Sequence, residues 1–149
     1  MSGMAAALLL KDEGANVTVL DSADEPKLLK STVDTLRGQN VRVVSGEAAD
    51  RDSAKYDFVV LSPGIDPASP LAQNFSSRKI DIIGELELGW RSAETPVIAI
   101  TGTNGKTTTT EMLAQMLNDC GQETIACGNI GKPLSEVARQ IQMMVRLTF

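Results

Sequence analysis

The sequence contains no histidine, and this absence excludes several kinds of catalytic site. A Ser-His-Asp triad, a Cys-His pair and a His-ligated metal all need an imidazole. None of them can be formed within these 149 residues. Cysteine is also scarce: Cys120 and Cys127 lack C-x-x-C spacing. Two reduced thiols are therefore favoured over a disulfide framework.

Long apolar runs and basic stretches are missing as well. No apolar run is long enough to span a bilayer. The run 4–10 has no basic segment before it and is followed by Lys11-Asp12-Glu13, so it predicts a helix rather than a signal peptide. The formal net charge of −5 argues against a nucleic-acid or anionic-membrane surface. We expect a cytoplasmic protein that binds neither nucleic acid nor a membrane. Its oligomeric state stays open.

The most informative stretch is 97–110, Val-Ile-Ala-Ile-Thr-Gly-Thr-Asn-Gly-Lys-Thr-Thr-Thr-Thr. Its apolar start, 97–100, predicts a buried strand, and a helix is expected from Lys106. In such a unit backbone N–H groups face a phosphate, Lys106 neutralises charge, and the Thr107 hydroxyl can ligate Mg²⁺. Ile100 stands where G-x-x-x-x-G-K-[ST] has Gly, so this loop is tighter. An ordinary strand–turn–helix with threonine caps is the alternative.

Elsewhere, strand and helix patterns alternate, which predicts a parallel α/β sheet. The expected strands are 16–20, 41–44, 58–61 and 80–83, and the expected helices are 4–13, 26–37, 70–77 and 84–92. A glycine turn normally opens such a domain after a first strand. Ser2-Gly3 are all that remains of that turn. Either the true start lies upstream or the domain lacks its central first strand.

A domain boundary is expected at 92–96, Ser-Ala-Glu-Thr-Pro. It divides the chain into 1–95 and 96–149. The second part begins with the phosphate loop, continues with a short strand at 124–126, and ends in a helix at 133–140.

Other candidate site residues each have a plainer interpretation. Asp21 closes the second strand, where a Rossmann protein binds a ribose hydroxyl, but it is equally a solvated strand end. The sequence Ser62-Pro63-Gly64 is either functional or a turn, and the same holds for Gly128 and Gly131. Glu85 and Glu87 are expected on a solvated helix face.

The segment 101–108, Thr-Gly-Thr-Asn-Gly-Lys-Thr-Thr, resembles the ATP-binding loop of the Mur ligases, which add amino acids to the peptidoglycan precursor. The segments 2–6, 19–22, 61–65, 83–88 and 128–131 are similar to the D-glutamate-adding branch of that family, and Asn104 favours this branch. The L-alanine-adding branch usually has His there. Folylpolyglutamate synthases share the loop without such an N-terminal domain. The resemblance covers 2–140, and the tail 141–149 is expected to differ.

The resemblance implies a Rossmann-like, UDP-sugar-binding domain at 1–95 and the beginning of a P-loop ATPase α/β domain at 96–149. It implies ATP-dependent addition of D-glutamate to UDP-N-acetylmuramoyl-L-alanine through an acyl phosphate, with ATP and Mg²⁺. The family's third domain and later catalytic groups have no counterpart here, so this chain is expected to be inactive alone. A non-catalytic nucleotide-binding module, the L-alanine-adding branch and a Rossmann NAD protein stay open as alternatives.

The resemblance also assigns residues to two sites, with Lys106 and Thr107 as the catalytic pair and Thr107 as the Mg²⁺ ligand. The implied ATP-binding residues are Gly102, Thr103, Asn104, Gly105, Lys106, Thr107 and Thr108. The implied UDP-sugar-binding residues are Ser2, Gly3, Asp21, Ser22, Ser62, Gly64 and Asn129.

Overall fold

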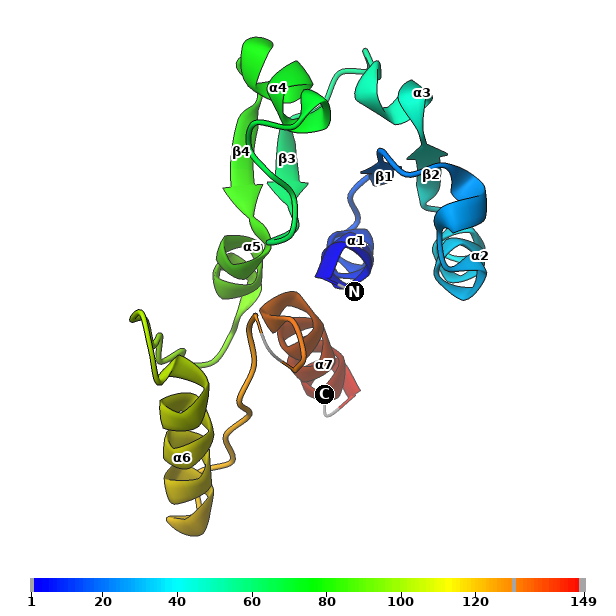
Figure 1. Cartoon of the computed structure of the whole chain (residues 1–149). Coiled ribbons are helices and arrows are strands. Elements are labelled where there is room, and N and C mark those ends of the chain that lie inside the picture. The colour runs from blue at the N-terminus through cyan, green and yellow to red at the C-terminus, as the bar shows by residue number, and fades with distance from the viewer. Residues whose placement is uncertain (1, 130, 148–149) are drawn as a thin grey trace.

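The computed structural model describes residues 2–129 and 131–147. Its strands form two parallel pairs, β1 with β2 and β3 with β4 (Figure 1). In register, Val19 lies opposite Val43 in the first pair, and Val59 lies opposite Ile82 in the second. The strands are β1 (Thr18–Asp21), β2 (Arg42–Ser45), β3 (Phe58–Leu61) and β4 (Asp81–Gly84).

A helix lies between each strand and the next, and further helices precede β1 and follow β4, so the strands and helices up to α5 alternate as expected from the sequence. They are α1 (Ser2–Asp12), α2 (Lys30–Gly38), α3 (Glu47–Asp50), α4 (Pro70–Ser77), α5 (Glu85–Ser92), α6 (Lys106–Asp119) and α7 (Leu134–Leu147). The bounds of α4 follow from its start: Ser69 Oγ accepts a hydrogen bond from Ala72 N–H, and Pro70 occupies the first turn.

The same helices cover both strand pairs, so the pairs belong to one layer. On one face α1 packs through Ala7 against Val19, and through Leu9 against Val60. On the other face a cluster built on Phe75 includes side chains from all four strands. Those side chains are Leu20, Val44, Val59 and Ile82.

No hydrogen-bonded ladder joins β1 to β3 within the described parts of the chain. The expected parallel sheet is therefore divided into two. In a Rossmann strand order, the position between these two strands belongs to the first strand of the domain.

Three helical segments differ from the sequence expectation. The helix expected at 133–140 is α7, which continues to Leu147. The helix expected at 26–37 is a 3₁₀ turn, Glu25–Lys27, followed by α2, because Leu28 and Leu29 are extended. The short helix α3 was not expected. It turns at Gly46, whose φ of +64° suits glycine, and it buries Ala49 in the Phe75 cluster.

The strands expected at 97–100 and 124–126 are wrong, because neither segment pairs with a strand. Ile98 is 63% exposed. A β-branched run forms a strand only beside a partner that supplies backbone hydrogen bonds. In the described chain no strand supplies them, and the backbone N–H and C=O of Thr124 bond to the side chain of Asn118 instead.

The last two long helices have different surroundings. In Figure 1, α6 lies apart from the other elements, and its one buried residue is Ala114. In contrast, α7 packs against α1 and α5. Arg139 of α7 also pairs with Asp12 of α1 at 2.6 Å. Among the described residues, none of the helices has the length and apolar character needed to cross a membrane.

Candidate functional site

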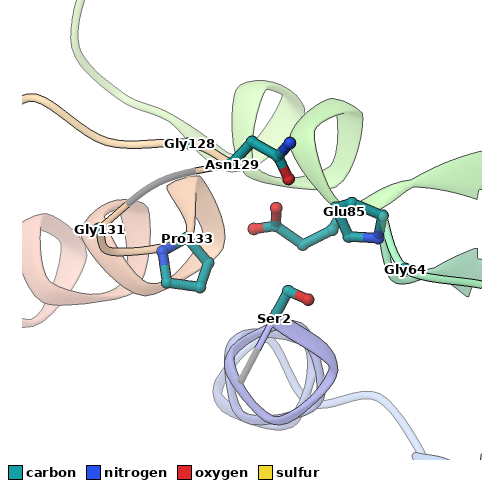
Figure 2. A pocket seen from close by; sticks show the side chains of 8 residues that line it. Ser2, Gly64, Glu85, Gly128, Asn129, Gly131 and Pro133 are labelled. Carbon is teal, nitrogen blue, oxygen red and sulfur yellow. The ribbon is translucent and has the colours of Figure 1, made fainter. Parts of the chain in front are cut away.

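A pocket of about 200 Å³ lies where the N-terminus of α1, the start of α5 and the loop before α7 meet. It brings together three of the expected UDP-sugar residues, Ser2, Gly64 and Asn129, which come from distant parts of the sequence (Figure 2). Its full lining is Ser2, Pro63, Gly64, Glu85, Gly128, Asn129, Gly131 and Pro133.

Two further expected residues, Gly3 and Ser62, meet beside this pocket. A Cβ built on Gly3 would lie 3.0 Å from Ser62 Oγ, which is tighter than ordinary contact. Glycine at this position lets α1 approach the turn that follows β3, a turn closed by Ile65 N–H donating to Ser62 C=O at 3.0 Å. The carboxyl ends of parallel strands face the ligand side of an α/β sheet.

Glu85 was expected on a solvated face, but it is 3% exposed, so that expectation is wrong. Its Oε1 accepts hydrogen bonds from Ser135 N–H at 2.9 Å and from Ser135 Oγ–H at 2.5 Å. The carboxylate thereby caps the N-terminus of α7 from another helix. Glu87 is exposed as expected, and pairs with Arg91 at 2.6 Å.

The burial of Glu85 could have been predicted from its spacing relative to the other inward-facing residues of α5. Glu85, Leu88 and Gly89 are the buried residues of α5, at positions i, i+3 and i+4. This spacing places Glu85 on the inner face of the helix.

The backbone of α5 approaches α7 closely at Gly89. A Cβ there would lie 2.7 Å from Ser135 N and 2.8 Å from the Leu134 carbonyl carbon. No real Cβ comes so near to backbone atoms, so glycine is required for this packing.

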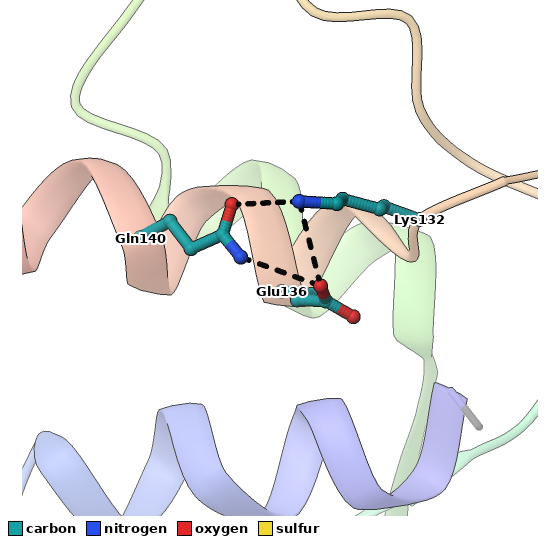
Figure 3. Close-up of polar contacts among 3 residues, drawn as sticks. All are labelled: Lys132, Glu136 and Gln140. Atoms are coloured by element: carbon teal, nitrogen blue, oxygen red, sulfur yellow. Dashed lines mark hydrogen bonds and ion pairs between the residues drawn. The ribbon is translucent and has the colours of Figure 1, made fainter.

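The loop before α7 is held at both ends. Gly128 N–H donates to Lys132 C=O at 2.8 Å. Lys132 Nζ lies 3.9 Å from Glu136 Oε1 and donates to Gln140 Oε1 at 3.3 Å, and Gln140 Nε2 donates to Glu136 Oε1 (Figure 3). These contacts tie the loop to the first turns of α7, and so fix the segment that carries Asn129.

Burial and charge act together on Cys127, which immediately precedes this loop. Desolvation is the main cause that raises the pKa of the Cys127 thiol above its ordinary value, and the negative charge of Glu85 adds to it. The neutral thiol is therefore favoured.

Asp21 and Ser22 lie at the end of β1 and do not line the pocket. Asp21 Oδ1 accepts a hydrogen bond from Ala23 N–H at 2.9 Å, which forms a local Asx turn. Ser22 Oγ donates to Asp50 Oδ1 at 2.6 Å. Both residues are exposed, so a ligand can reach them.

The loop expected to bind phosphate lies in the 93–105 connection and leads directly into α6. Gly105 has φ of +76°, a left-handed conformation that favours glycine, and it precedes the first residue of this 14-residue helix. Lys106 Nζ donates to Gly102 C=O at 2.5 Å and to Thr103 C=O at 3.4 Å, so its side chain folds over the loop.

The donor set at the start of α6 fits a phosphate. The first helical hydrogen bond runs from Thr109 N–H to Gly105 C=O at 2.9 Å, which leaves the preceding N–H groups without helical acceptors. Thr107 is exposed and can present its hydroxyl to Mg²⁺. In the described ranges no group of three or more His, Cys, Asp or Glu side chains could hold a metal by itself.

Comparison with known proteins gives matches over most of the chain. A model described as "Mur ligase MurD-like, N-terminal domain" matches residues 1–84, and a model described as "Mur ligase middle domain" matches residues 100–146. The second match includes 141–146, so our expectation that the tail differs from the family is wrong for those residues.

Curated relatives agree with these matches. The UDP-N-acetylmuramoylalanine–D-glutamate ligases of Lactococcus lactis subsp. cremoris (strain MG1363) and Geobacter metallireducens are each 42% identical to this chain, over 95% and 91% of its residues. That of Streptococcus pyogenes serotype M49 is 40% identical over 93%. The matched region is 31%, 30% and 30% of these relatives, so the chain spans under a third of their length.

Proposed function

The chain belongs to the MurD-like branch of the Mur ligase family, and from this we propose that it supplies the UDP-sugar-binding and ATP-phosphate-binding parts of a D-glutamate-adding ligase. The observation that carries the proposal is the start of α6. There a left-handed glycine, a lysine folded over the loop and N–H groups that precede the first helical hydrogen bond are found together. A helix N-terminus of this kind attracts phosphate through its N–H groups and its dipole.

The proposed reaction forms an amide from the alanine carboxylate of UDP-N-acetylmuramoyl-L-alanine and the amine of D-glutamate. A carboxylate does not react with amines, so it must first be phosphorylated. Mg·ATP would supply the phosphoryl group to the carboxylate and leave as ADP, and the D-glutamate amine would then displace phosphate from the acyl phosphate. Catalysis of the first step consists mainly of positioning and charge neutralisation. Lys106 would contact the β- and γ-phosphates, and Thr107 would hold Mg²⁺.

The remaining residues of the phosphate loop would hold ATP through their backbones. Glycine at 102 and 105 allows the phosphates to approach closely, with φ of +152° and +76° respectively. The residues in this role are Gly102, Thr103, Asn104, Gly105 and Thr108.

The UDP-sugar would lie along the carboxyl ends of the strands. Asp21 and Ser22 would contact the uracil or ribose at the end of β1. Ser2, Gly3 and Ser62 would surround the diphosphate at the N-terminus of α1. Gly64 and Asn129 would then contact the muramoyl group in the pocket.

We further propose that these 149 residues bind nucleotide but do not ligate D-glutamate alone. The residues of the phosphate loop are exposed, and the preceding segment 97–101 pairs with no strand. A loop in this condition neither excludes water nor aligns a second nucleophile, and alignment is worth roughly 7–11 kcal/mol of barrier. D-glutamate-dependent release of phosphate by the purified chain, with formation of the dipeptide product, would contradict this part.

The test of nucleotide binding is Lys106→Ala, measured by calorimetry with Mg·ATP. Loss of a charged hydrogen bond should weaken binding by about 1.5–3 kcal/mol. Lys55→Ala is the matched control, because Lys55 is exposed and lies far from the loop in sequence. Equal affinity in the wild type and the Lys106 variant would show that the loop is not a phosphate site.

A further inference from the structure

Glu85 faces the pocket with one of its two carboxylate oxygens uncommitted. Oε1 accepts both hydrogen bonds from Ser135. No hydrogen bond to Oε2 is made by residues 2–129 or 131–147, and Oε2 is not one of their buried side-chain atoms left without a partner. Figure 2 shows this carboxylate in the space between Asn129 and Ser2. Because Glu85 lines the pocket and Oε1 is occupied by Ser135, this geometry points to Oε2 as the acceptor for a donor that a ligand supplies.

The rest of the pocket indicates which kind of ligand group fits. None of the eight lining residues is basic. A phosphate placed there would meet the negative charge of Glu85 with no cation to offset it. A neutral group with hydroxyl or amide N–H donors would instead satisfy Oε2. The volume of about 200 Å³ exceeds the roughly 150 Å³ cavity that holds a benzene ring, so one sugar ring has room.

We propose that Glu85 is a specificity-determining residue whose Oε2 accepts a hydrogen bond from a hydroxyl or amide N–H of the sugar portion of a nucleotide sugar. The diphosphate then lies outside the pocket, at the start of α1 near Gly3 and Ser62. This inference rests on the proposed function, and it adds a residue that the family resemblance did not assign to the site.

The packing of α5 on α7 fixes the direction of this carboxylate. Glu85 is the first residue of α5, and its Oε1 is held by the second residue of α7. Four residues further along α5, Gly89 brings the two backbones into close contact. With Oε1 anchored in this way, Oε2 cannot turn away from the pocket, and a fixed acceptor discriminates between ligands better than a mobile one.

The test is Glu85→Gln in the full 149-residue chain, with affinities for UDP-N-acetylmuramoyl-L-alanine and for UDP measured by calorimetry. The glutamine oxygen can still accept from Ser135, which leaves its NH₂ group directed at the pocket, where it meets another donor. We expect UDP-sugar affinity to fall roughly 10- to 100-fold, the loss of one charged hydrogen bond, while UDP affinity is unchanged.

Ser135→Ala is the matched control, because it removes one hydrogen bond from Oε1 without touching Oε2. It should lower stability and leave the ratio of UDP-sugar to UDP affinity as in the wild type. The inference is overturned if Glu85→Gln keeps the wild-type affinity for the UDP-sugar, or if it weakens UDP binding as much as UDP-sugar binding. It is also overturned if Ser135→Ala lowers the ratio of UDP-sugar to UDP affinity as much as Glu85→Gln does. Absence of UDP-sugar binding in the wild type would instead overturn the proposed function, and the inference with it.

Discussion

Residues 2–92 and residues 93–129 differ in how their backbone polar groups are satisfied. In the first region every strand has a parallel partner and is covered by helices. In the second region, α6 forms a regular helix, while the β-branched run at 97–101 pairs with nothing in the described chain. A helix closes its hydrogen bonds within itself, whereas a strand needs a neighbour. Helix formation is therefore a local property here, and strand formation is not.

Among the substitutions that test this comparison, Phe75→Ala is expected to have the largest effect on the free energy of unfolding. Phe75 is 1% exposed and packs edge-on against Tyr56, with ring centroids 5.8 Å apart. Its loss should lower the free energy of unfolding by about 3–5 kcal/mol in urea titrations. Met112→Ala in α6 is the control, since Met112 is 61% exposed and its truncation should cost at most about 0.5 kcal/mol. Similar losses at the two sites would show that α6 is as well packed as the strand layer.

An intermediate effect is expected from Gly89→Ala, at the contact that joins α7 to the first region. The added methyl would clash with the backbone at Ser135 and should destabilise the chain by about 1–3 kcal/mol, measured by thermal unfolding. Gly38→Ala is the control, because a Cβ at Gly38 meets nothing within 4 Å. It should be neutral, or stabilising by up to about 1 kcal/mol. If both substitutions behave alike, the close approach of α5 and α7 is not part of the stable fold.

The smallest effect concerns the reactivity of the two thiols. Cys127 belongs to the second region and lies near Glu85 of the first, so its reactivity reports on the contact between the two regions. The raised pKa of Cys127 lowers its thiolate fraction at pH 8, so iodoacetamide should label it more slowly than the exposed Cys120. Glu85→Gln removes one cause of the raised pKa and should speed labelling of Cys127 alone, as followed by mass spectrometry. Faster labelling of Cys127 than of Cys120 in the wild type would contradict this contact.

What the sequence predicted well was set by nearby residues. The bounds of α4 follow from Ser69 and Pro70, and the start of α6 follows from Gly105 and Lys106. These signals act within one turn of helix, so the sequence contains them in full.

What the sequence did not predict depended on residues distant along the chain. The run at 97–100 has the composition of a strand, but composition does not provide a partner strand. Glu85 is a charged residue of the kind found on solvated helix faces, yet it is buried, and it accepts a hydrogen bond from Ser135, which lies 50 residues away. Ser2, Gly64 and Asn129 were named as candidates from a resemblance, and their meeting in one pocket depends on the packing of α7 on α1 and α5.

The division of the strand layer has a consequence for how the molecule opens. Because β1–β2 and β3–β4 share covering helices but no ladder, they are coupled in the described chain by side-chain packing and by side-chain hydrogen bonds such as those from Asn74 Nδ2 to the carbonyls of Asp50 and Asp52. One pair can then separate from its covering helices without breaking any backbone hydrogen bond of the other. In native-state hydrogen exchange, the amides of the two pairs should therefore fall into two groups with distinct opening free energies, rather than exchanging as one cooperative sheet.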